Sequence, residues 1–321
     1  MKDLKYRILQ NKDIDFEKWD SVIRKSINES PLAYSDILNI ISPQWEGLIV
    51  GNYEAVMPLP VQKRMGYKFI QMPMDIQNLG LFSEFKELIN IDHDFFIDKT
   101  FKNYKFISYS FVFENQYIAN KNIKLRTTHY IDLNKKYEVL FKKYDQRHRR
   151  NLKDFYNNNI DIIESLDIDP IINIRKEMSK NVPALKLIDK QEHILRKLLD
   201  HSLNKNIGKL LYAKYHSNYI ASGFFLKGQQ RDVFLISASL TLGKEKKAAF
   251  GIVDYFLKQT ENQNKILDLC GSDIKGIALF LKGFGAEKTN YIQYSKNQLP
   301  YVLKIIKKHN LLDKIKKKGL L

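Results

Sequence analysis

The segment 266–291, ILDLCGSDIKGIALFLKGFGAEKTNY, holds the residues best suited to chemistry. Its apolar start predicts a buried strand, a Cys270-Gly271 turn follows, and Lys282 stands at the far end of an amphipathic helix. A lysine there can bring positive charge to a phosphate or to a negative charge that develops during a reaction. It can equally be a cation favoured by the helix dipole, with Gly283 as the helix cap.

Two further groups of residues fit the same chemistry. Asp75, in the segment FIQMPMDIQNLGLFS, can orient an amine or accept the proton that an amine loses during acyl transfer. A loop aspartate also makes local turns, so that alternative stays open. Arg147, Arg149 and Arg150 concentrate positive charge in one helical stretch, and we expect them beside a groove between two domains, in contact with phosphate or RNA. The other interpretation of these arginines is an ordinary solvated helix.

Composition narrows the class of protein. A formal charge of +17 on 321 residues favours polyanionic partners such as a nucleotide, coenzyme A, tRNA or an acidic membrane surface, although lysines spread over a solvated surface would give the same sum. The N-terminus lacks the apolar core of a signal peptide, and no run approaches the roughly 20 apolar residues that cross a bilayer. These features predict a cytoplasmic protein.

Several familiar catalytic and binding motifs are missing from the sequence. The single cysteine, Cys270, excludes an intramolecular disulfide and a cysteine-rich zinc site, and the seven histidines show no metal-ligand spacing. There is no Gly-x-Ser-x-Gly elbow, Walker loop or dinucleotide fingerprint. We therefore expect no metal and no tightly bound cofactor. The lack of an obvious nucleophile favours direct attack by an acceptor amine, without a covalent enzyme intermediate.

The elements that must position these residues follow one order twice. In each half helices come first, then a strand meander, and then a helix and a strand, which indicates an internal structural repeat. In the second half the helices fall at 169–204, the three strands at 209–240, and one helix at 245–260 precedes the strand at 266. A basic helical stretch, 135–159, joins the halves. No Pro/Gly/Ser-rich linker separates them, so we expect close packing.

Within this frame the sequence resembles the Fem-type aminoacyl- and peptidyltransferases. Asp268, Gly271, the pair Gly276-Ile277 and the run 282–285 match the strand, Asp-x-x-Gly turn, Gly-Ile step and Phe-Lys-x-x-Phe-Gly pattern of that family, with Leu281 in place of the first phenylalanine. The basic stretch before the second domain is similar too. The resemblance is good over roughly 130–295 and looser in the first half, where Asp75 resembles the aspartate of a Gly-Pro-x-x-Asp region.

The resemblance implies a mixed α/β and α+β fold with two tandem acetyltransferase-like (GNAT) units, each a twisted mixed sheet flanked by helices, and a cleft between them. We expect one unit at 1–125, a second at 126–298 that carries the donor cleft, and a basic C-terminal helix at 299–321. That amphipathic tail is expected to pack on the N-terminal unit; the alternative is contact with the anionic inner face of the membrane.

In such a fold two parallel strands splay apart and the donor lies between them. We assign these strands to DVFLISASL and ILDLC, so backbone groups near Ser237, Ala238 and Ser239 would bind the donor carbonyl and its developing oxyanion. Gly271 would let the chain turn without crowding the gap. The resemblance also implies a functional role for Lys282, as a cation at a phosphate or at the developing charge.

The donor itself is left open between aminoacyl-tRNA and an acyl-coenzyme A. Lys244, Lys246 and Lys247 lie where acyl-CoA-binding GNAT units place a glycine-rich pyrophosphate cradle, but only Gly243 is nearby. The lysines can still neutralise phosphate, and a solvated helix start is the plain alternative. The sequence thus predicts a transferase that moves an aminoacyl or acyl group onto an amine of a small-molecule or lipid-linked acceptor. The alternatives are an acyl-CoA-dependent N-acyltransferase and a non-catalytic basic protein that binds nucleic acid or membrane.

Overall fold

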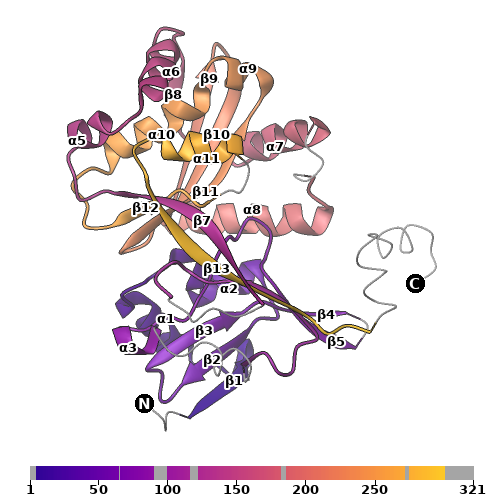
Figure 1. Cartoon of the computed structure of the whole chain (residues 1–321). Coiled ribbons are helices and arrows are strands. Elements are labelled where there is room, and N and C mark those ends of the chain that lie inside the picture. Colours follow the sequence, from indigo (N-terminus) through magenta and orange to yellow (C-terminus); the bar gives the residue numbers. More distant parts are fainter. Residues whose placement is uncertain are drawn as a thin grey trace, which may run out of the picture.

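The structure is a computed structural model that describes residues 5–64, 66–89, 100–115, 122–181, 186–271 and 275–300. It forms two lobes joined by two long strands that run diagonally between them (Figure 1). The N-terminal lobe, drawn in indigo and purple, contains β1 (Tyr6–Gln10), α1 (Phe16–Lys25), α2 (Ser35–Ile41), β2 (Glu46–Val50), β3 (Ala55–Leu59), β4 (Val61–Arg64), β5 (Tyr67–Gln71), α3 (Lys86–Ile89) and β6 (Phe106–Ser110).

The C-terminal lobe follows the first of the two linking strands, β7 (Ile123–Asp132), and precedes the second, β13 (Glu287–Asn297). Its elements are α5 (Tyr137–Lys142), α6 (Gln146–Tyr156), β8 (Asp161–Glu164), α7 (Asp169–Asn181), α8 (Asp189–Asn204), β9 (Gly208–Tyr215), β10 (Asn218–Leu226), β11 (Arg231–Ser239), α9 (Thr241–Glu245), α10 (Ala248–Gln259), β12 (Ile266–Asp268) and α11 (Lys275–Lys282).

One large sheet runs through both lobes. Strands β1, β2 and β3 make a small antiparallel sheet, whereas the large sheet has the order β4-β5-β6-β13-β7-β12-β11-β10-β9-β8. β13 pairs with β7 along most of its length and with β6 at its C-terminal end. The predicted boundary between residues 125 and 126 falls inside β7, so these two strands belong to both lobes.

The two lobes repeat one order of elements, as the sequence predicted. From β1 in one lobe and from β8 in the other, a strand and two helices are followed by an antiparallel meander and then by a helical segment that joins two consecutive, parallel strands. In the N-terminal lobe the parallel pair is β5 and β6, and in the C-terminal lobe it is β11 and β12. The architecture is therefore a mixed α+β fold built from two similar units.

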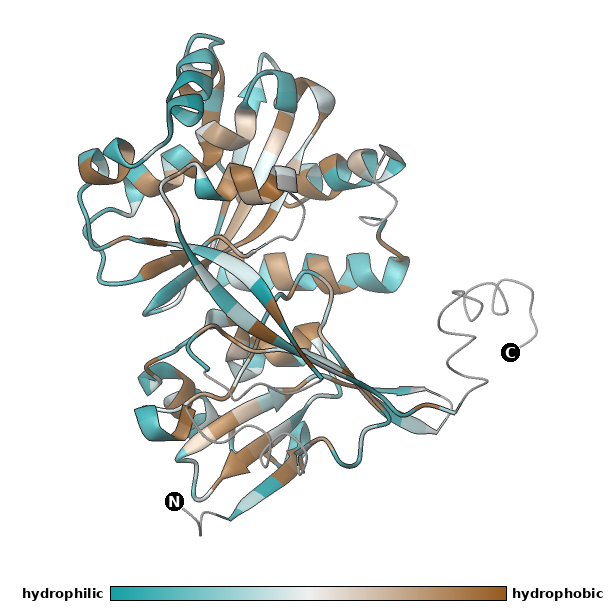
Figure 2. Cartoon of the chain, in the orientation of Figure 1, coloured by the Kyte–Doolittle hydropathy of each residue, from teal (hydrophilic) through white to brown (hydrophobic). Residues whose placement is uncertain are grey.

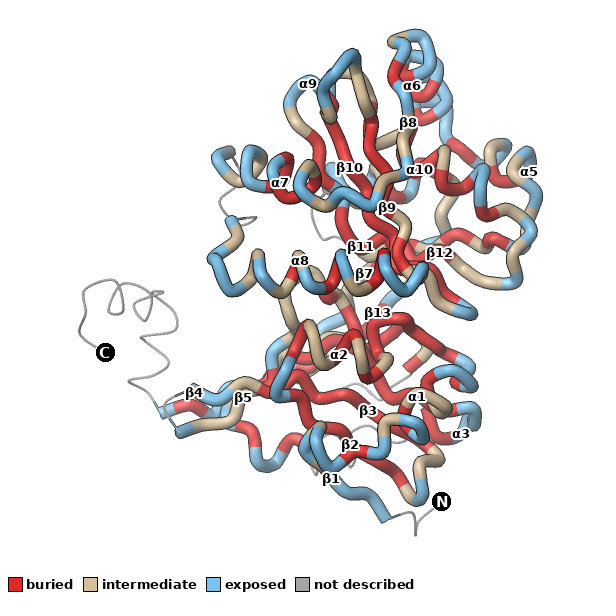
Figure 3. The backbone as a smooth tube through the Cα atoms, turned by 180° about the vertical axis from the view of Figure 1, so that it is seen from behind, coloured by how far each residue is buried: buried red, intermediate tan, exposed pale blue. Residues whose placement is uncertain are grey.

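Side chains on neighbouring positions of β9 show which helices cover which face of the C-terminal sheet. Leu210 and Tyr212 pack in the core cluster that holds the apolar residues of α7 and α8, whereas Leu211 and Ala213 pack with those of α6, α10 and α11. Because successive strand residues point to opposite faces, α7 and α8 lie on one face and α6, α10 and α11 on the other. The core shared with α7 and α8 continues into the N-terminal lobe (Figure 3).

Local sequence explains the helix that opens the N-terminal lobe. Asp15 caps α1 by accepting a hydrogen bond from the Lys18 backbone N–H at 3.1 Å. Trp19 and Ile23 are one helical turn apart and both are fully buried. The Trp19 ring meets Trp45 edge-on, with 4.7 Å between ring centroids. These contacts fix the helix on the small sheet.

Two helix predictions need correction. The helix predicted at 245–260 starts later, because Lys247 adopts a left-handed backbone (φ 59°) that separates α10, which begins at Ala248, from the short helix α9 before it. The basic stretch is two helices, since Asp145 accepts the His148 backbone N–H at 2.7 Å and starts α6 afresh. The C-terminal helix expected at 299–321 lies outside the described residues, except for its first two positions. No helix in the described part has the length and apolarity to cross a membrane.

Candidate active site

The parallel strands β11 and β12 separate soon after they meet. They pair only at Arg231–Ile266, Asp232–Leu267 and Val233–Asp268, while β11 continues to Ser239. At the point of separation β11 also carries a β-bulge, since its register against β10 shifts by one residue at Leu235. The divergence predicted between these two strands is therefore present.

A small cavity of about 140 Å³ lies against the diverging part of β11. Leu235, Ile236, Ser237 and Ala238 form one wall, and Asp75, Arg175 and Met178 line the rest. The structure thus brings together three residues that the sequence assigned to the site from two distant segments. The fourth, Ser239, is nearly buried at the end of β11, and its backbone N–H donates to the Met178 sulfur at 3.0 Å. A thioether is a weak acceptor, so a stronger one can displace it.

Asp75 enters this cavity from the N-terminal lobe and pairs with a buried arginine. The Arg175 guanidinium of α7 contacts both Asp75 carboxylate oxygens at 2.8 Å, in a bidentate pair between the lobes. Asp75 has a left-handed backbone (φ 64°), which aims its side chain out of the loop. Sequence reasoning missed Arg175. A signal was available, because it falls on the same helix face as Ile171 and Met178, where a charge is out of place.

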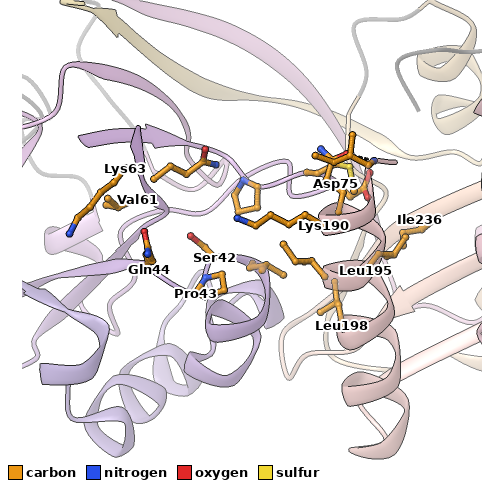
Figure 4. A pocket seen from close by; sticks show the side chains of 17 residues that line it. Ser42, Pro43, Gln44, Val61, Lys63, Asp75, Lys190, Leu195, Leu198 and Ile236 are labelled. Carbon is orange, nitrogen blue, oxygen red and sulfur yellow. Dashed lines mark hydrogen bonds between the residues drawn. The ribbon is translucent and has the colours of Figure 1, made fainter. Parts of the chain in front are cut away.

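A larger cleft of about 470 Å³ adjoins the small cavity, since Asp75 and Ile236 line both. It lies between the lobes, with α8 as one wall and the end of α2, the strand β4 and the loop 73–75 as the other (Figure 4). The α8 wall is apolar, with Leu195 and Leu198 among its residues. Lys190 reaches across the opening and Lys63 stands at the opposite rim. The cleft therefore combines an apolar wall with a basic rim.

A buried ionic cluster sits where β11 and β12 begin to separate. Arg231, with 2% of its side chain exposed, donates to Asp268 at 3.1 Å and to Glu114, and its guanidinium lies 4.9 Å from the centre of the Phe113 ring. Asp268 also accepts from the Thr128 hydroxyl at 3.2 Å and from the Cys270 N–H at 2.9 Å. The aspartate of the Asp-x-x-Gly turn thus fixes the end of β12.

Lys282 lies on the other face of the sheet from the Asp75–Arg175 pair. It is exposed at the end of α11 and lines neither cavity. Burial lowers the pKa of His129 on β7, and the charges of Lys288 and Lys282 lower it further, so Lys282 lies near that strand.

Gly283 and Gly285, which follow Lys282, have other roles than the helix cap expected at Gly283. Gly285, not Gly283, adopts the left-handed conformation (φ 71°), and its N–H donates to the Lys282 carbonyl at 3.0 Å. At Gly283 a side chain would overlap the buried His148 ring of α6. His148 is held in turn by Asp145 at 2.9 Å and by the Phe280 carbonyl at 2.8 Å, which ties α6 to α11.

The three lysines after β11 line neither cavity. The backbone N–H groups of Lys244, Lys246 and Lys247 donate to the carbonyls of Leu240, Leu242 and Lys244, at 3.0, 2.9 and 3.2 Å. The Lys246 ammonium donates to Asn158 at 2.6 Å and lies 4.9 Å from the centre of the Tyr215 ring. Only Lys244 is fully exposed. The backbone N–H groups of these three lysines are therefore not free.

The arginines of α6 do not lie beside the groove between the lobes, and that placement was wrong. α6 packs on α10 at the end of the C-terminal lobe farthest from the N-terminal lobe (Figures 1 and 3). Arg147, Arg149 and Arg150 are exposed there, and Figure 2 shows α6 as a mainly hydrophilic helix. The sequence defined the charge of this helix but not the face of the sheet that it covers.

This chain is similar to known proteins in structure but not in sequence. Neither a family model nor a curated protein sequence matches the chain. Among solved structures, FemX aligns with a TM-score of 0.63 at 11% identity, over 92% of this chain and 98% of FemX. A tandem GNAT protein from the clavulanic acid biosynthesis pathway aligns with a TM-score of 0.52 at 9% identity, over 93% of this chain and 99% of that one.

A C-terminal domain assigned to a lysylphosphatidylglycerol synthetase from Agrobacterium fabrum also aligns. Its TM-score is 0.54 at 9% identity, over 90% of this chain and 93% of that domain. At such identities the likeness establishes the fold alone. The chain has a Fem-like double GNAT fold, with two tandem acetyltransferase-like units along almost its whole length.

Proposed function

We propose that this chain is a transferase that moves an aminoacyl group from a charged tRNA onto an acceptor amine, with the donor carbonyl in the gap between β11 and β12. One observation carries the proposal. The diverging edge of β11, from Leu235 to Ala238, shares a cavity with a carboxylate and a guanidinium, and that cavity opens into a cleft between the lobes.

The reaction needs few groups from the protein. The acceptor nitrogen attacks the carbonyl carbon of the donor ester, a C–N bond forms, and the C–O bond to the tRNA breaks. The tRNA leaves as a ribose hydroxyl, which takes up the proton that the amine loses. Backbone N–H groups on the free edge of β11 can stabilise the oxyanion, and the Ser239 N–H, now held by a sulfur, adjoins the stretch that lines the cavity. Asp75 can orient the amine or take its proton, because a carboxylate in a bidentate pair retains free lone pairs.

The lining of the larger cleft supports an acceptor with both apolar and anionic parts. Leu195, Leu198 and Ile194 of α8 offer apolar surface, and Lys63 and Lys190 offer positive charge at the rim. A lipid-linked amine or a small phosphorylated amine has this combination. One aligned structure is assigned as a synthetase whose name specifies an aminoacylated phospholipid. That likeness in fold adds weight to a lipid-linked acceptor.

The segment after β11 argues against coenzyme A as the donor. A pyrophosphate in a GNAT unit needs free N–H groups at the start of the helix that follows this strand. Here α9 covers the ends of β10 and β11, and the Lys244, Lys246 and Lys247 N–H groups are already bonded to carbonyls. A side chain at Gly243 would overlap the Ile220 carbonyl, so α9 is pressed against the sheet. The three lysines expected at the pyrophosphate thus offer it no free backbone N–H group, which favours a tRNA donor.

Transfer can be measured by the stability of the bond that carries the label. The full chain is mixed with total tRNA charged with radiolabelled amino acids and with a precursor fraction rich in lipid-linked and soluble amines. Amino acids on tRNA are esters and leave it in mild base, whereas the expected amide product keeps its label. Two results together would contradict the proposal. The label from charged tRNA would be released by mild base with every acceptor, and labelled acetyl-CoA would instead give a base-stable product.

The exposed arginines of α6 supply a prediction about the tRNA. Changing Arg147, Arg149 and Arg150 together to glutamate should weaken tRNA binding at least roughly tenfold, and should lower the slope of log affinity against log salt by about 2–3. A matched control changes Lys12, Arg24 and Lys25, which are exposed on the N-terminal lobe, to glutamate. Binding titrations at several salt concentrations compare the two variants. Equal losses in both would show that only net charge matters and that α6 is not a contact surface.

A further inference from the structure

The gap between β11 and β12 needs a physical cause, because two parallel strands that have begun to pair gain from continuing. Unpaired backbone groups in a protein interior are costly, and the free edge of β11 is mostly buried. Along β12 the Ile266 N–H donates to the Gln230 carbonyl just before β11, whereas the Leu269 N–H donates to His129 on β7. Continued pairing with β11 would therefore use the backbone of Cys270, and the bend at that residue leaves the backbone groups of Gly271 in need of other partners.

Gln77 of the N-terminal lobe occupies both of those groups. Its side-chain carbonyl accepts the Gly271 N–H at 2.7 Å, and its amide nitrogen donates to the Gly271 carbonyl at 2.8 Å. The same nitrogen lies 3.2 Å from the Tyr291 hydroxyl of β13. A primary amide that bonds both backbone groups of one residue fixes the position of that residue. Gln77 thus ties the turn after β12 to the N-terminal lobe and holds it away from β11.

Two features of the turn make this arrangement rigid. Cys270 has a left-handed backbone (φ 56°), which bends the chain away from the line of β12. Gly271 is pressed against β7 so closely that a side chain would overlap the Thr127 carbonyl. The turn is therefore held by β7 on one side and by Gln77 on another.

The loop that carries Gln77 also carries Asp75, two residues earlier. Asp75 holds Arg175 on α7, which packs against β10 and β11, while Gln77 holds the turn after β12. One short loop of the N-terminal lobe therefore has a fixed contact on each side of the gap. Its residues Pro73, Met74 and Asp75 also line the larger cleft between the lobes.

We propose that Gln77 is a positioning residue that holds the gap between β11 and β12 open, so that the N-terminal lobe sets the geometry of the donor site in the C-terminal lobe. The meaning of the gap as a donor site rests on the proposed function, whereas the bracing role does not. Since the same loop lines the larger cleft, an acceptor bound in that cleft would contact the loop that carries Gln77. Acceptor and donor positions are thus coupled through 73–77.

Hydrogen–deuterium exchange tests the brace without any substrate. Gln77→Met keeps the volume of the side chain but removes both hydrogen bonds to Gly271. We expect the Gly271 N–H to exchange on the order of tenfold faster, and the amides of 235–239 on β11 to change their exchange together with it. Gln77→Glu keeps the acceptor for the Gly271 N–H and should fall between wild type and Gln77→Met. Gln259→Met, an exposed glutamine at the end of α10, is the matched control.

Two results would overturn the brace. Unchanged exchange at Gly271 would mean that the two hydrogen bonds do not hold the turn in solution. Faster exchange at Gly271 with no change at 235–239 would make Gln77 a local cap. Charged and deacylated tRNA binding is then compared for wild type and Gln77→Met. A wild type that does not distinguish them removes the proposed function but leaves the exchange result standing. If wild type and Gln77→Met prefer charged over deacylated tRNA to the same degree, donor binding does not depend on Gln77. That result would overturn the positioning role.

Discussion

Replacing Arg231 by methionine should lower the free energy of unfolding by about 3–5 kcal/mol at neutral pH. The arginine is 2% exposed and bridges two carboxylates, Asp268 and Glu114, at the point where β11 and β12 separate. Methionine fills much of the space but leaves both carboxylates without their cation. An uncompensated buried charge is among the few causes of a loss this large. Chemical denaturation of the two proteins measures it.

The same variant should show a changed dependence of stability on pH. Burial raises the pKa of Glu114 above its ordinary value, and the Arg231 charge opposes that rise. Without the guanidinium the pKa rises further, so the folded variant binds more protons than the unfolded chain over a wider range above the ordinary pKa. Stability of the variant therefore increases as pH falls through this range. The difference from wild type should be smaller at about pH 5 than at about pH 7.

Arg24→Met provides the control for this experiment, because Arg24 is exposed on α1. A surface substitution of this kind should change the free energy of unfolding by no more than about 0.5 kcal/mol. A loss below about 1 kcal/mol for Arg231→Met, independent of pH, would contradict the view that the cluster anchors the start of the gap.

Asp75→Asn should reduce the rate of transfer on the order of a hundredfold, which is the lower end of what a positioned acid or base contributes. The asparagine keeps the shape of the side chain but can neither take a proton from the amine nor neutralise Arg175. The loss should appear in kcat more than in the KM for the acceptor, since the cleft wall on α8 is unchanged. The base-stable label of the transfer assay measures both constants.

Asp36→Asn is the matched control for Asp75. Asp36 also joins the lobes, through His201 and Lys205 of α8 at 2.9 Å each, but it lines neither cavity. Burial alone would raise the pKa of Asp36, yet hydrogen bonds from Lys205 and His201 hold it below its ordinary value. The contacts of Asp36 with His201 and Lys205 therefore stabilise the folded protein above the ordinary pKa of an aspartate. This contribution is lost as the pH falls below that value. We expect the transfer rate of Asp36→Asn to equal that of wild type. Equal losses of rate in Asp36→Asn and Asp75→Asn would mean that Asp75 only joins the lobes.

Much of the fold follows from local sequence. Hydrophobic alternation and turn residues located β9, β10 and β11, and the repeated order of elements indicated two similar units before any contact was known. The long strand β13 was underestimated, because its polar residues Lys288, Asn290 and Lys296 hide a strand that gains its partners from both lobes. The break at Lys247 was missed because a non-glycine residue with positive φ leaves no mark in the sequence.

The candidate site was predictable in its parts but not in its assembly. The diverging strands, Gly271 and Asp75 were indicated by the resemblance to the Fem-type family, which assigns each of them a place in the site. Arg175 was missed although its charge on an apolar helix face marked it, and its partner Asp75 lies 100 residues away. Gln77 was missed because its partner Gly271 lies 194 residues away and only the tertiary structure brings the two together. The position of α6 could not be derived either, because charge does not determine which face of a sheet a helix covers.

Equilibrium binding of total charged tRNA, the same tRNA after deacylation, and acetyl-CoA at one fixed salt concentration tests the central claim most directly. Ser237 is exposed and lines the small cavity, so Ser237→Phe should fill the donor gap with little effect on folding. The account predicts that wild type binds charged tRNA more tightly than deacylated tRNA, and that Ser237→Phe loses this preference while still binding both. Saturable binding of acetyl-CoA, with no preference between the two tRNA samples, would contradict it.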